Sequence, residues 1–125
     1  MRSIIATSVL ACLLAVPTAA QEAEAALPQL TMEQRSSLRC GVAFGLIARG
    51  QAEGDARAAA YPAMEPRGRE FFVRTMARLM DEHGLTREQA NKLALATTSE
   101  MMAETPQDRE RMMPACLLLL EASGL

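Results

Sequence analysis

Aromatic residues are scarce in this chain: its 125 residues include three Phe, one Tyr and no Trp. Cysteine is also scarce, and three Cys are too few for a disulfide-dense miniprotein. Neither sign of charge dominates, because the formal net charge is −2, so the composition indicates no basic surface for nucleic acid. Half of the residues are hydrophobic, which excludes a disordered protein and leaves room for one domain.

The first twenty residues have the pattern of a secretory signal peptide. Arg2 supplies the positive start, residues 4–16 are an uncharged apolar stretch, and small residues precede a cleavage site expected after Ala20. Cleavage after Ala25 is an alternative. A membrane anchor is the competing interpretation. The apolar stretch 4–16 is shorter than the roughly 20 apolar residues that a membrane span needs, which disfavours it. A lipoprotein cysteine at Cys12 is a further alternative. The pattern predicts a periplasmic or secreted protein with no stable membrane span after cleavage.

The mature chain is expected to consist of a flexible leader, residues 21–30, and a single helical domain, residues 31–125. Its two cysteines are Cys40 and Cys116. An exported protein meets an oxidising compartment, so we expect these two residues to form one disulfide. Two separate buried thiols are the alternative. A disulfide that closes such a long loop stabilises the fold by about 4.5 kcal/mol in the chain-entropy model, because it restricts the unfolded chain.

The composition of the mature chain predicts an all-α fold, a compact bundle of four to five short helices with one disulfide. It has 18 Ala, 13 Leu and 8 Met against one Ile and two Val. The former residues favour helices, whereas β-branched residues favour strands. Capping boxes at Thr31 and Thr86, and Pro106 after a Thr cap, mark three helix starts. Helices are expected at about 31–52, 66–83 and 86–103, with an irregular segment or short helix in 55–66. A last helix from 106 to 122 is expected to kink at Pro114 or to divide there into two short helices, 106–113 and 114–122.

Hydrophobic spacing predicts which faces are buried. In the first helix Cys40, Phe44 and Ile47 share a face, and little charge interrupts residues 38–47, so this helix is expected to be central. In the second, the stripe is Phe72, Met76, Leu79 and Met80, with Val73 beside it. The charged side of that helix offers two pairs at i,i+4 spacing, Glu70–Arg74 and Arg78–Glu82.

No group of residues indicates catalysis. His83 is the only histidine, at a helix end where it can interact with free carbonyls, and no second His or Cys pair stands at metal-ligand spacing. No G-x-S-x-G elbow and no glycine-rich phosphate loop occur. We therefore assign no catalytic, cofactor-binding or metal residue and no cofactor. A small exported enzyme remains the least favoured hypothesis.

Methionine is the one unusual feature of the mature chain. Thioethers are soft ligands that select Cu(I), so a Met-based Cu(I)-binding periplasmic protein is an alternative function. The competing interpretation is that methionine fills gaps in the core, and a third is an exposed Met-rich groove that accepts a partner. The candidate copper ligands are Met76, Met80, Met101, Met102, Met112 and Met113.

Three segments carry a resemblance: Leu38-Arg39-Cys40, the stretch at 68–74, and Pro114-Ala115-Cys116. In these the chain resembles small secreted helical proteins of Gram-negative bacteria that have no assigned activity. In size and compartment it is also similar to the acid-stress periplasmic chaperones. The leading hypothesis is a non-enzymatic periplasmic protein that acts through contacts with an unknown protein partner, as an envelope accessory or in stress, and not with nucleic acid. Its oligomeric state is left open.

Overall fold

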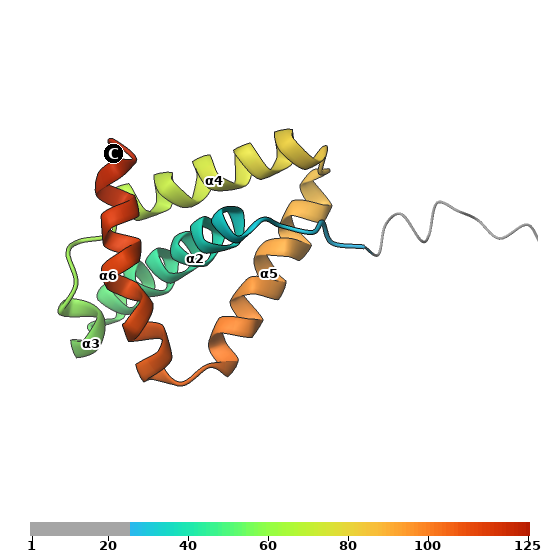
Figure 1. Cartoon of the computed structure of the whole chain (residues 1–125). Coiled ribbons are helices and arrows are strands. Elements are labelled where there is room, and N and C mark those ends of the chain that lie inside the picture. Colours follow the sequence, from blue (N-terminus) through green and yellow to red (C-terminus); the bar gives the residue numbers. More distant parts are fainter. Residues whose placement is uncertain (1–25) are drawn as a thin grey trace, which may run out of the picture.

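A computed structural model describes residues 26–125 of the chain, which form helices and no strand (Figure 1). The all-α prediction is therefore confirmed. The predicted signal peptide, 1–20, and the first half of the leader lie outside the described residues. Of the rest of the leader, Leu30 packs against the core. The helices are α2 (Met32–Glu53), α3 (Ala56–Ala59), α4 (Arg67–His83), α5 (Arg87–Ala103) and α6 (Pro106–Ala122).

The first of these helices, α2, is the centre of the bundle. It contacts all four other helices, and α4 runs alongside it (Figure 1). The predicted capping box starts it, because the Thr31 hydroxyl accepts from the Gln34 backbone and the Gln34 side chain accepts from the Thr31 N–H. From Leu38 to Phe44 nearly every side chain is buried, as the apolar sequence predicted for a central helix.

A single side chain, Gln51, holds the segment between α2 and α4. Its amide donates to the carbonyls of Ala58, Tyr61 and Pro62, and its oxygen accepts from the Met64 N–H. These bonds satisfy backbone groups that the irregular segment leaves free. They also fix Met64, whose side chain is fully buried under α2.

Close approach of α4 to α2 depends on Gly68. A Cβ at this position would lie 2.8 Å from the Cβ of Phe44, closer than real carbon atoms pack. The same approach brings the rings of Phe44 and Phe71 edge to face, with centroids 5.3 Å apart. Phe72 lies across Gly41 and is only partly buried.

The predicted stripe of α4 was therefore partly wrong. Met76 and Leu79 are buried as expected, but Phe71 takes the core position assigned to Phe72, and Val73 is exposed. Where Gly68 lets α4 approach α2, the Phe71 ring packs edge to face on Phe44, whereas Phe72 lies over Gly41 at the side of the contact. The predicted pairs Glu70–Arg74 and Arg78–Glu82 are not among the ion pairs of residues 26–125; Glu82 instead accepts from Gln34.

The turn between α4 and α5 has the predicted geometry. Gly84 adopts the left-handed conformation at φ 61°, and the Leu85 N–H donates to the Met80 carbonyl, which closes a Schellman-type end. Thr86 and Gln89 then form the second capping box, which starts α5. The turn reverses the chain and brings α5 back across the bundle (Figure 1).

The last helix was expected either to kink at Pro114 or to divide there into two short helices, and the division into two helices was wrong. One continuous helix, α6, runs from Pro106 to Ala122 with Pro114 inside it. Pro114 is exposed, so the Glu110 carbonyl that loses its helical bond can be hydrated. Met113, Cys116 and Leu120, on both sides of the proline, are buried in one core and hold the two halves in line. Within residues 26–125 no helix combines the length and apolar character that crossing a membrane requires.

Candidate interaction surface

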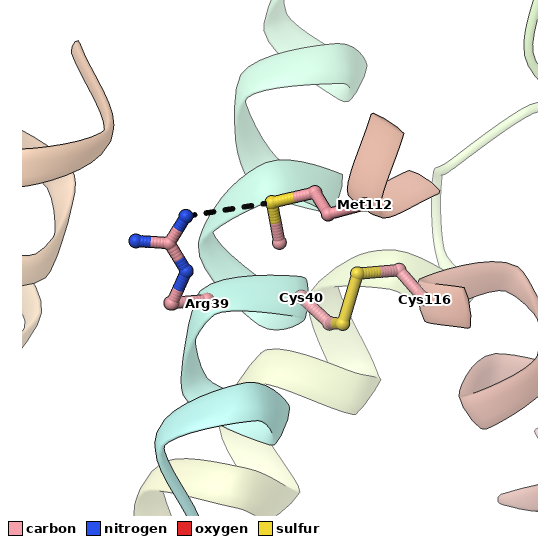
Figure 2. Close-up of a disulfide and its surroundings, with 4 residues drawn as sticks. All are labelled: Arg39, Cys40, Met112 and Cys116. Atoms are coloured by element: carbon pink, nitrogen blue, oxygen red, sulfur yellow. Dashed lines mark hydrogen bonds between the residues drawn. A yellow bond between two sulfur atoms is a disulfide. The ribbon is translucent and has the colours of Figure 1, made fainter. Parts of the chain in front are cut away.

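The predicted disulfide fixes α6 to the central helix. Cys40 of α2 and Cys116 of α6 are bonded, with Cα atoms 5.2 Å apart, and both residues are buried (Figure 2). The bond closes a loop of 76 residues. Because it sits in the middle of α6, it prevents this helix from rotating or sliding on α2. The face that α6 turns to the core, and the one it turns away, are therefore both set.

An arginine next to the disulfide joins three helices. Arg39 of α2 pairs with Glu104, which follows α5, at 2.8 Å, and its Nη2 also lies 3.8 Å from the sulfur of Met112 in α6 (Figure 2). Arg39 and Glu104 keep about a quarter of their side-chain surface exposed. This ion pair accounts for the one charge within the apolar stretch of α2, and it secures the corner where α5 meets α6.

The side of α6 that faces away from the bundle is apolar in its middle. Leu118 is 72% exposed although its neighbour Leu120 is 2% exposed. Exposed residues recur at spacings of three and four, so they lie along one stripe of the helix. We refer to this stripe as the outward face of α6, and its members are Arg111, Pro114, Ala115, Leu118, Glu121 and Ala122.

A small cleft lies on the other flank of α6. It has a volume of about 200 Å³, and its apolar floor includes Leu46, Ile47 and Met113. Typical small-molecule sites are about 300–1,000 Å³. The guanidinium of Arg109 at its rim already donates to the carbonyls of Met101 and Glu104, where it caps α5. The cleft is thus too small, and its charged rim too committed to the fold, to be the leading candidate for a site.

Three of the six methionines considered as copper ligands are buried in the core, at positions 76, 101 and 113, and Met64, which was not a candidate, is buried as well. The sulfur of Met112 accepts from Arg39. Met102 is exposed on α5 and Met80 is partly buried on α4. The core-filling interpretation explains the buried four directly, because an unbranched thioether adapts to irregular gaps.

His83 lies at the predicted place, in the last turn of α4. Its Nε2 is 3.1 Å from the Oε1 of Gln34, whose amide in turn binds Glu82. The histidine thus joins the end of α4 to the capping box of α2. Across residues 26–125, no group of three or more His, Cys, Asp or Glu side chains is placed to hold a metal ion.

Sequence reasoning missed the outward face of α6. The signal was present: residues 112–120 (MMPACLLLL) are uncharged all around the helix, and an edge helix can bury only about half of its circumference. A helix with such a run must be central, as α2 is, or must expose apolar side chains.

Comparison of the chain with models of known protein families, with curated proteins and with solved structures finds no match. Any function must therefore be inferred from the residues themselves.

Proposed function

We propose that the mature chain is a non-enzymatic, exported helical protein of the periplasm that acts through protein–protein contacts. It would serve as an accessory subunit of the envelope or in an envelope stress response. The contact surface is the outward face of α6. The observation that carries the proposal is the exposure of Leu118 and its apolar neighbours on a helix that the disulfide holds rigidly.

Two features support export, one in the N-terminal sequence and one in the folded domain. The N-terminal residues have the pattern of a signal peptide. The Cys40–Cys116 disulfide fits a protein that folds in an oxidising compartment, where such bonds form and persist.

The contact half is supported by energetics. Removing apolar surface from water contributes about 25 cal/mol per Å², so an exposed leucine is a source of binding energy that folding has not used. An exposed apolar patch that polar residues border is typical of contact sites. Because α6 is fixed by Cys116 and by its buried face, binding would not have to order it, which lowers the entropic cost of association.

Site-specific photo-crosslinking in the producing cells tests this proposal. A photoreactive residue at Leu118 should give a defined adduct of the exported protein, identifiable by mass spectrometry. The matched control is the same residue at Leu95, which is 70% exposed on α5 and outside the outward face. Adducts from Leu118 and none from Leu95 would support the proposal. Equal yields from both positions, or none from Leu118, would contradict it.

A further inference from the structure

The outward face of α6 has a symmetric order along the helix. A basic residue, Arg111, stands three positions before Pro114, and an acidic residue, Glu121, stands three positions after Leu118. The spacing 111, 114, 118, 121 is the three–four–three pattern with which one helix packs along another. All four residues are exposed in the chain on its own.

This order is complementary to itself. If two copies of α6 lie antiparallel about a two-fold axis at residue 116, Arg111 of each copy faces Glu121 of the other. The same register places Pro114 of each copy against Leu118 of the other. A parallel pair would instead put arginine against arginine and glutamate against glutamate, which is unfavourable.

We infer that the outward face of α6 binds a second copy of this chain, in an antiparallel two-fold pairing with Arg111–Glu121 ion pairs at both ends. The inference rests on the proposed function, because it names the partner of the same surface. Isologous pairing of this kind is the commonest form of association among soluble proteins.

The charged ends are free to change partners. Arg111 pairs with Asp108 at 3.0 Å, and Glu121 pairs with Arg67 at 3.0 Å. All four side chains are at least one third exposed. Exposed ion pairs of this kind contribute about 0–1 kcal/mol each to stability. Arg111 can therefore leave Asp108 and bind Glu121 of the second copy at little cost in free energy. Glu121 has a second carboxylate oxygen with which it can keep Arg67 while it binds the other copy.

The size of the outward face of α6 limits the expected affinity between the two copies. One helical stripe of six residues offers less than the roughly 800 Å² per partner of a stable interface. The pairing is therefore a concentration-dependent equilibrium rather than a permanent dimer. Its apolar centre supplies the affinity, and its charged ends select the antiparallel register.

Sedimentation equilibrium of the purified mature chain, disulfide intact and at moderate salt, tests the inference. The wild type should show a monomer–dimer equilibrium. Leu118→Glu, and separately Arg111→Glu, should weaken the dimer about tenfold or more, because each change acts twice across the two-fold axis. The double variant Arg111→Glu with Glu121→Arg should recover part of the lost affinity, since the swapped charges face each other again. Recovery is incomplete because each swapped side chain lies beside a like charge of its own chain, Asp108 or Arg67. The control Leu95→Glu should leave association unchanged.

A wild type that stays monomeric at several hundred micromolar, or a charge swap that recovers nothing, would overturn the second-copy inference. Circular dichroism of every variant checks whether the helical fold is retained. The outcome also separates the two proposals. A monomeric protein that still crosslinks from Leu118 to a different protein contradicts the self-pairing but supports the proposed function, whereas failure of both experiments contradicts both.

Discussion

Two helices of this bundle have similar apolar stretches and opposite surroundings. The central helix, α2, contacts the other four helices, and nearly every side chain from Leu38 to Phe44 is buried. Residues 112–120 of α6 are covered on one side only, so Leu120 is buried while Leu118 is exposed. In α2 the apolar residues are explained by folding. In α6 about half of them are exposed, and the proposed contact surface rests on this difference.

Removing the bond between the two helices has the largest expected effect. The double variant Cys40→Ala with Cys116→Ala should lose about 4 kcal/mol of unfolding free energy by the chain-entropy model, which lowers Tm by about 15 °C or more. Thermal unfolding followed by circular dichroism measures this. Amide exchange should also accelerate more in α6 than in α2, because the edge helix has fewer other contacts. A double variant that melts within two or three degrees of the wild type would contradict the role of the disulfide as a clasp.

The packing of α4 on α2 can be tested at Gly68. Gly68→Ala places a methyl group 2.8 Å from the Cβ of Phe44 and should destabilise the fold by about 1–3 kcal/mol, since α4 must move away. Gly45→Ala is the matched control, because a Cβ there meets nothing within 4 Å. In the interior of α2 it should stabilise the helix by up to about 1 kcal/mol. Urea unfolding of both variants measures the two changes in unfolding free energy. If both variants were destabilised equally, or both stabilised equally, the argument that Gly68 permits a close approach of α4 to α2 would be refuted.

The uncovered side of α6 can be tested at its proline. Pro114→Ala restores the backbone N–H that can donate to the Glu110 carbonyl and removes the clash of the ring. Because the site is exposed and no packing is lost, the variant should gain about 1–3 kcal/mol of unfolding free energy, the helical gain being partly offset by the freer unfolded chain. Urea unfolding at low protein concentration measures this gain. A loss of stability would mean that the proline packs in the monomer, contrary to its exposure.

Local signals predicted the elements well, because they act within a few residues. The capping boxes at Thr31 and Thr86 and the left-handed Gly84 each bind backbone groups of their own turn, so the sequence alone locates them. The disulfide followed from the predicted export and from the two cysteines of the predicted mature chain. These predictions required no knowledge of how the helices pack.

The errors arose where one helix decides the environment of another. The choice of Phe71 over Phe72 depends on the approach that Gly68 allows between α4 and α2, which periodicity within α4 does not contain. The continuity of α6 through Pro114 depends on core residues on both sides of it. The candidate site was missed for the same reason, because only the packed bundle shows that α6 is at its edge.

The central claim is that the outward face of α6 contributes to association and not to folding. The most direct measurement compares Leu118→Ser with Leu120→Ser, two leucines two positions apart on opposite faces of one helix, by urea unfolding at low micromolar concentration and by sedimentation. We predict that Leu120→Ser loses about 2–4 kcal/mol of unfolding free energy, whereas Leu118→Ser stays within about 0.5 kcal/mol of the wild type but loses association. If Leu118→Ser were as unstable as Leu120→Ser, or associated as the wild type does, the claim would be contradicted.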